Sequence, residues 1–485
     1  MENEFREARL LELSAQAPYD ESGEGKVDDR PKLPREWSSR KKAGIVALVS
    51  LLNFLVNFSA TMPSPGISDI MADTGTMIRI LATFSVSVYI LGIAFGPLLL
   101  APLSEIYGRL PIYTCTNILF IYFTSLCSLA SELPVLIVLR FLDGCVGSVP
   151  IVIGGGTIAD MYPPETRGRA MSIYMMSAMM GPPMGPIVAA VITQKLGWRW
   201  IFGTAAIASA ILSIVCFFCL EETHEETVLR RHEKRKIERK QQRICKLSWP
   251  LFELKGSKQL ANSLRQPFRL LFTDRAVLVL GIYQAFAYGY MIFMLTSFSN
   301  VFVGQYGFST STSGLPYLGI AVGFGVGVVI SSTLSDRIAS VLTLRNDGVR
   351  IPAFRLPLMA WSCWIPPIAL AGYGWSAFYK VHFMVPIAAV ALYSTGLQLI
   401  MVNVQVYLSE AHTTRVASAI AAVTVLRCLL GTVLPLVGEI MYEKLGLGWG
   451  NTLLACMALA LMPLPWIVMR SGKKAGKEMR LDDKA

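Results

Sequence analysis

The sequence predicts an all-α polytopic membrane protein with twelve transmembrane helices arranged as two six-helix bundles. Of its 485 residues, 53% are hydrophobic and only 16% are charged, whereas an average soluble domain has about 25% charged residues. The apolar residues form runs of roughly 20, long enough to cross a hydrocarbon core about 30 Å thick. In addition, motifs of the first half of the chain recur in the second half in the same order.

Twelve apolar runs are identified as spans, six on each side of a polar central segment. They lie near 44–63, 80–103, 111–131, 134–158, 168–194 and 198–220, and near 276–299, 314–335, 355–375, 381–404, 416–440 and 449–470. The predicted organisation is an N-terminal tail at 1–43, a first bundle at 44–220, a basic central loop at 221–275, a second bundle at 276–470 and a C-terminal tail at 471–485.

Positive charge gathers before the first span and in the even-numbered loops, whereas the odd-numbered loops contain few lysines and arginines. The positive-inside rule therefore predicts that both termini face the cytoplasm. The net charge of +11 raises nucleic-acid binding as an alternative. However, the basic run RRHEKRKIERKQQR at 230–243 is typical of a cytoplasmic loop lying against an anionic leaflet. We expect the lipid bilayer as a partner, and no nucleic acid.

Three pairs of similar stretches relate the two halves. They are TRGRAMSI (166–173) and TRVASAI (414–420), KLGWRW (195–200) and KLGLGWG (444–450), and LSEIYGR (103–109) and LSDRIA (334–339). An offset of six spans preserves orientation, so the repeat is parallel, with its axis along the membrane normal. This symmetry is typical of a two-bundle secondary transporter with one central site.

The chain resembles a known family at several of these motifs. The motifs are APLSEIYGR (101–109), LRFLDGCVGS (139–148), GPPMGP (181–186), GWRWIF (197–202), FRLLFTDRAVLVLGIYQAF (268–286) and GWGNTLL (448–454). They are similar to those of the major facilitator superfamily, in its fungal branch of twelve-span drug:proton antiporters. The resemblance implies the major facilitator fold, export by proton antiport and a gating role for the loop after span two. The chain departs from the family pattern at Asp143, where Gln is common, and at Leu110, where a basic residue is common.

Arg140 and Asp143 are charged residues within the fourth predicted span, three residues apart and therefore on one helix face. A charge inside a span costs a few kcal/mol and is a functional candidate by default. The functional interpretation is proton uptake by Asp143 under the influence of Arg140. The alternative is a permanent salt bridge that holds span four in place.

A second group of charges lies where spans meet the cytoplasm. Together they are expected to form a network that closes the cytoplasmic side, and the resemblance supports this role; the alternative is separately solvated loop charges. The gate candidates are Glu105, Gly108, Arg109, Asp160, Arg167, Arg169, Asp336 and Arg337.

Span five contains Gly181, Pro182, Pro183, Gly185 and Pro186, a density of helix breakers that predicts a bend and a close helix contact. Spans five and eight meet between bundles in the resembled fold. We therefore expect the span-five glycines to pack against the span-eight stripe of Gly319, Gly323 and Gly327. Gly92 and Gly96 of span two, with Gly431 of span eleven, are expected at the opposite seam.

The aromatic residues of span seven recur at helical spacing, and several polar side chains lie within other spans. They would suit a bulky, mostly apolar ligand, but packing is the alternative for each. The substrate-binding candidates are Asn57, Tyr283, Gln284, Phe286, Tyr290, Gln398, Asn403, Gln405 and Arg427. The partner of Arg427 must come from another helix, a backbone carbonyl or an acidic ligand.

No phosphate-binding loop, nucleophile elbow or metal-ligand spacing occurs in the sequence. We therefore predict neither an enzyme nor a cofactor or metal. The predicted function is export of drug-like or secondary-metabolite molecules by a monomer in exchange for protons. The predicted location is the plasma membrane, with the vacuolar membrane as the alternative. Proton-coupled uptake of a nutrient or polyamine, and a sensor without flux, are the competing functions.

Overall fold

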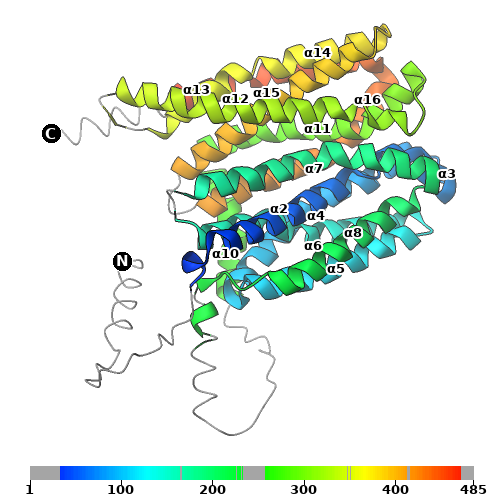
Figure 1. Ribbon diagram of the computed structural model, residues 1–485. Coiled ribbons are helices and arrows are strands. Elements are labelled where there is room, and N and C mark those ends of the chain that lie inside the picture. The colour runs from blue at the N-terminus through cyan, green and yellow to red at the C-terminus, as the bar shows by residue number, and fades with distance from the viewer. Residues whose placement is uncertain are drawn as a thin grey trace, which may run out of the picture.

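A computed structural model describes residues 33–163, 166–225, 227–230, 232, 257–346, 348–349, 351–411 and 416–470. The side chains of residues 105, 257–264, 416 and 417 are not among the described ones. Every regular element in the described part of the chain is a helix (Figure 1). This confirms the all-α prediction.

Six long helices form the first group. They are α2 (Ser39–Thr61), α4 (Arg79–Tyr107), α5 (Arg109–Leu129), α6 (Leu133–Met161), α7 (Arg167–Leu196) and α8 (Arg199–Cys219). Within this group α4 packs on α6, α2 on α7, and α5 on both α6 and α8. We call the end where α2 begins and α8 ends the terminal side, and the end where α2 ends and α4 begins the far side.

The second group begins with α11 and contains the remaining spans. They are α11 (Arg275–Tyr306), α12 (Tyr317–Leu344), α13 (Leu356–Ser362), α14 (Ile365–Phe378), α15 (Met384–Ala411) and α16 (Val416–Leu461). In this group α11 packs on α16, α12 on α15, and α14 on both α15 and α16.

Ten segments are long and apolar enough to cross a membrane, two fewer than the predicted spans. One predicted span is divided into two short helices, and two others are joined in one long helix. The ninth span is divided into α13 and α14 just before Pro366 and Pro367, which cannot donate hydrogen bonds to the preceding turn. Conversely, α16 contains two spans that meet at Gly446, where φ is 71°. The described residues thus form twelve spans, as predicted.

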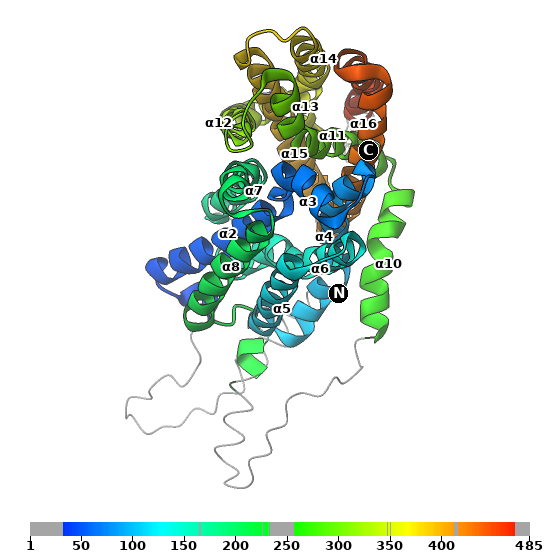
Figure 2. The same cartoon turned by 90° about the vertical axis from the view of Figure 1, so that its right-hand side faces the viewer.

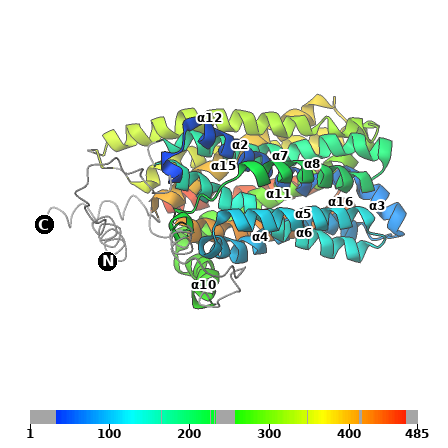
Figure 3. The same ribbon diagram turned by 60° about the horizontal axis from the view of Figure 1, so that its bottom comes forward.

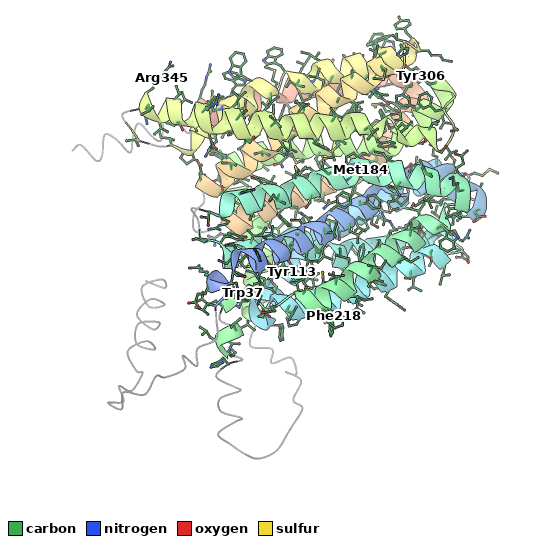
Figure 4. The ribbon with its side chains drawn as sticks, in the orientation of Figure 1. Trp37, Tyr113, Met184, Phe218, Tyr306 and Arg345 are labelled. Carbon is green, nitrogen blue, oxygen red and sulfur yellow. The ribbon has the colours of Figure 1, made fainter. Side chains whose placement is uncertain are left out.

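Large apolar side chains face outward along the spans, as a bilayer requires. Phe218 is 78% exposed at the edge of the first group (Figure 4), and Ile211 and Ile368 are each 61% exposed. The chain is therefore a multi-pass membrane protein.

The two groups meet along two seams. Figure 2 shows α7 beside α12, and α4 beside α16, and both pairs are in contact. Short elements complete the far side: η2 (Ser64–Gly66) contacts α11, and η4 (Thr312–Gly314) contacts α7.

The central segment contains a helix that the sequence analysis did not predict. Helix α10 (Ser257–Thr273) lies at the terminal side, across the direction of the spans (Figures 2 and 3). It contacts α4 of the first group and α11 and α16 of the second. Most of the basic run at 230–243 lies outside the described residues.

Candidate functional site

Arg140 and Asp143 form an ion pair inside the first bundle. Nη1 of Arg140 lies 3.5 Å from Oδ2 of Asp143, and neither side chain is exposed to solvent. The Arg140 guanidinium also lies 4.2 Å from the centre of the Tyr89 ring, and its Nη2 donates a 2.9 Å hydrogen bond to the Ala60 carbonyl. Thr124 donates to Oδ1 of Asp143 at 2.9 Å. The predicted pairing on one helix face is confirmed.

This ion pair is incompletely hydrogen-bonded. Among the described atoms, Asp143 Oδ2 and the Arg140 atoms Nε and Nη1 have no hydrogen-bond partner. Most buried polar groups in proteins are satisfied. An ion pair with unsatisfied atoms is a poor device for stability, because burial costs several kcal/mol per ion.

At the terminal side of the first bundle, Arg109 joins α5 to α6. Its Nε donates to Asp160 Oδ2 at 2.8 Å, and its backbone N–H donates to Glu222 Oε1 at 2.8 Å. Gly108 separates α4 from α5 at φ 95°, a conformation that requires glycine, and the Glu222 carboxylate lies against it. Glu222 was not among the predicted residues.

Two other predicted gate residues, Arg167 and Arg169, do not join this group in the described part of the chain. Arg167 and Arg169 make no ion pair with any described residue. The side chain of Glu105 lies outside the described part of the chain. Of the gate candidates in the first bundle, the described contacts thus join Arg109 to Asp160 and add Glu222.

The second bundle has a matching ion-pair group centred on Arg355. Nη1 of Arg355 lies 2.5 Å from Asp336 Oδ1, and Nε of Arg355 lies 3.0 Å from Glu410 Oε1. Arg337, which the sequence analysis proposed, is exposed and takes no part. Arg355 precedes span nine as Arg109 precedes span three, so the repeat itself was the signal that could have identified it.

The predicted packing of span-five glycines against span-eight glycines is wrong. A Cβ on Gly181 would lie 2.7 Å from Asn57 Cβ, and one on Gly185 would lie 2.8 Å from Thr61 Oγ1, so both face α2. The stripe Gly319, Gly323 and Gly327 faces α15 instead. Both sets bring helices together within one bundle, although α7 and α12 do touch.

The prediction that Gly92, Gly96 and Gly431 lie at the opposite seam is wrong for the first two and confirmed for the third. Gly92 and Gly96 face the backbone of α6 within the first bundle, not α16. Gly431 does lie at the seam, where an added Cβ would be 3.5 Å from Ile90 Cγ2 of α4.

The prolines of span five do not interrupt α7. Pro186 lacks an N–H for the carbonyl of Pro182. Thr61 donates to this carbonyl at 2.7 Å. A neighbouring helix thus satisfies the freed carbonyl.

The span-seven aromatics are buried and pack against other side chains. Tyr290 is fully buried, donates to Asn451 Oδ1 and lies 5.1 Å from the Tyr393 ring. Tyr283 packs in a core cluster of the second bundle, whereas Phe286 packs in a cluster that includes residues of both bundles, although the two were predicted to share one ligand-facing stripe.

Three of the polar candidates differ in burial and in their hydrogen bonds. Asn403 is fully buried, and Ser335 donates to its side chain at 2.9 Å, so it joins α12 to α15. Asn57 and Gln405 are partly exposed. The Asn57 amide donates to the Asn53 side chain at 3.0 Å.

Two further polar candidates are buried glutamines, Gln284 and Gln398. Their side chains are 1% and 3% exposed. Each Oε1 lacks a hydrogen-bond partner among the described atoms.

On the far side, Glu439 of α16 joins the second bundle to α4. Its Oε2 lies 3.1 Å from Arg79 Nε, and Thr83 donates to its Oε1 at 3.3 Å. We call these three residues the far-side latch. A pocket of about 200 Å³ adjoins it, lined among others by Asn300 and Tyr442.

Two further hydrogen bonds join the bundles at this end. Thr432 donates to the Ser87 carbonyl at 3.2 Å, and the Ser311 N–H donates to Gln194 Oε1 at 3.2 Å. At the terminal side, by contrast, the described ion pairs each stay within one bundle. The polar contacts thus hold the far side closed.

Two bundles related by a parallel repeat, with ionisable groups inside the spans, define a membrane transporter. The family model of the Major Facilitator Superfamily matches residues 49–435. The chain belongs to this superfamily, and membership in a transporter family confirms that it is not an enzyme.

Relatives and solved structures agree with this assignment. The chain is 40% identical to the efflux pump radE of Floropilus chiversii over 94% of this chain and 85% of that protein. It is also 40% identical to the MFS transporter prlG of Fungal sp. (strain NRRL 50135), over 96% and 98%. The xylose transporter XylE from E. coli, in a partially occluded inward open conformation, matches with a TM-score of 0.62 at 14% identity, covering 88% of this chain and 98% of that one. This last likeness concerns the fold alone.

Proposed function

We propose that the chain exports drug-like or secondary-metabolite molecules from the cytoplasm by proton antiport with alternating access. The observation that carries the proposal is the fully buried Asp143, whose Oδ2 has no hydrogen-bond donor in the described structure. A carboxylate oxygen without a donor is available to take a proton. Arg140, 3.5 Å away, favours the ionised form and so promotes its release.

Alternating access requires gates at both ends. The far-side latch closes one end, and the Arg109 and Arg355 ion-pair groups brace each bundle at the other. With the basic loops in the cytoplasm, the terminal side is cytoplasmic and the structure corresponds to an inward-facing state. The relative radE is an efflux pump by name, which supports export as the direction. The protein acts as a monomer in the plasma membrane.

Export is tested in yeast cells that lack their own pumps. Cells expressing the chain should accumulate less of some compounds in a panel of apolar toxins, and a protonophore should abolish the difference. Export is refuted if expression raises accumulation, or if no compound responds.

Asp143→Asn tests the proton site. The variant cannot ionise, so concentrative transport in proteoliposomes with an imposed pH gradient should fall at least tenfold, while exchange of substrate across the membrane at equal pH continues. Asp69→Asn is the matched control, since Asp69 is an exposed carboxylate of α3 (Ile67–Thr74). Unchanged pH-driven transport by Asp143→Asn would remove Asp143 from the mechanism.

A further inference from the structure

Arg427 is a cation in a spanning helix without a carboxylate partner in the described chain. Its guanidinium lies 4.7 Å from the Tyr288 ring centre, and Nη1 donates weakly to the Met401 sulfur at 3.5 Å. Its Nε is buried and unpartnered. Arg140, by contrast, has its carboxylate on the same helix.

Arg427 lies just beyond the contacts that join α4 to α16. Gly431, one turn further toward the far side, faces Ile90 of α4, and Thr432 is bonded to the Ser87 carbonyl. Arg427 is displaced from these contacts toward the terminal side and is partly exposed. In the proposed inward-facing state, Arg427 thus lies on the cytoplasmic side of the contacts that join α4 to α16.

Two unpartnered acceptors lie on the helices that flank Arg427. Gln284 is one turn before Tyr288 on α11, and Gln398 is three residues before Met401 on α15, so each shares a helix face with a residue that touches Arg427. Both Oε1 atoms lack donors among the described residues. Unsatisfied polar groups inside a membrane are costly. A ligand that supplies their partners would remove this cost.

We infer that Arg427, Tyr288, Gln284 and Gln398 bind an organic anion, namely an aromatic or conjugated molecule with a carboxylate or acidic enolate and a hydroxyl or N–H group. The anionic oxygen pairs with Arg427, the ring stacks near Tyr288, and the donor group bonds a glutamine oxygen. This inference rests on the proposed function, because it names the substrate class of the same transporter. It also disfavours polyamines, which Arg427 would repel.

The test is binding of a hydroxynaphthoic acid and its methyl ester to the purified full chain, measured by titration calorimetry. The acid should bind at least tenfold more tightly than the ester, because a charge-assisted pair is typically worth a factor of ten or more. Arg427→Gln should lower the affinity for the acid at least tenfold, and Arg427→Lys should restore part of it. Arg345→Gln is the control, because Arg345 is exposed at the terminal end of α12 (Figure 4).

Equal binding of acid and ester, unchanged affinity in Arg427→Gln, or failure of the acid to bind the wild type would overturn the inference. The readout needs no flux, so it separates this inference from the proposed function. Export of neutral toxins without acid binding would leave the function standing and refute the anion site. Acid binding without export of any compound would leave the anion site standing and refute the proposed export function.

Discussion

Replacing Glu439 by Gln removes one charge from the far-side latch and little else. Gln has nearly the same shape and can still accept the hydrogen bond from Thr83. What is lost is the ion pair with Arg79, whose two atoms lie 3.1 Å apart and connect the two bundles. The substitution should therefore favour the state in which the far side is open.

The size of the effect follows from burial. The Glu439 side chain is 8% exposed and that of Arg79 is 34% exposed, so the pair is neither fully buried nor free in solvent. Exposed pairs contribute about 0–1 kcal/mol, and breaking a buried pair costs about 3–5 kcal/mol. An intermediate value of about 1–2 kcal/mol corresponds to a roughly 5–30-fold shift in the population of the two states.

Distances between spin labels can measure this shift. Exposed far-side lysines offer one site in each bundle, Lys195 and Lys380, and both can be changed to Cys after the exposed native cysteines are replaced. The long-distance population should increase in Glu439→Gln and in Arg79→Gln, with no further increase in the double variant. Glu443→Gln, one turn away and exposed, is the control. Identical distance distributions in all variants, or additive effects of the two substitutions, would refute the latch.

Two pairs of substitutions test the helix packing and the Arg355 ion-pair group. Gly185→Leu should destabilise the purified protein by about 1–3 kcal/mol, because the side chain would push α7 away from α2; Gly325→Leu, where no atom lies within 4 Å of an added Cβ, should have little effect on the melting temperature. Arg355→Gln should cost about 1–3 kcal/mol because it removes the partly buried ion pairs of Arg355 with Asp336 and Glu410, whereas Arg337→Gln should not change thermal unfolding. If Gly325→Leu were the more destabilising of the glycine variants, or Arg337→Gln of the arginine variants, the assigned contacts would be wrong.

The sequence was sufficient where the information is local. Twelve spans follow from apolar runs, and the pairing of Arg140 with Asp143 follows from a spacing of three residues on one helix. The hydrogen bond that Thr61 donates to the freed Pro182 carbonyl could be predicted only in general terms. The rule requires a partner for the carbonyl but does not say which residue supplies it.

Contacts between spans were harder to predict. Glycines such as Gly181 and Gly323 mark close approach, but a small residue does not specify which helix approaches, and both turned out to face neighbours in their own bundle. The Arg355–Glu410 pair joins two different spans and needed the repeat to be applied residue by residue. Helix α10 was missed because its polar face made it resemble loop sequence.

Coupled movement of protons and substrate tests the central claim most directly. Proteoliposomes containing the purified chain and an internal pH indicator are loaded with the toxin that the yeast cells export most strongly, and external dilution then drives the toxin outward. The account predicts that protons enter the vesicles as the toxin leaves, and that Asp143→Asn abolishes this proton movement. Toxin efflux without proton movement, or with protons leaving in the same direction, would contradict antiport.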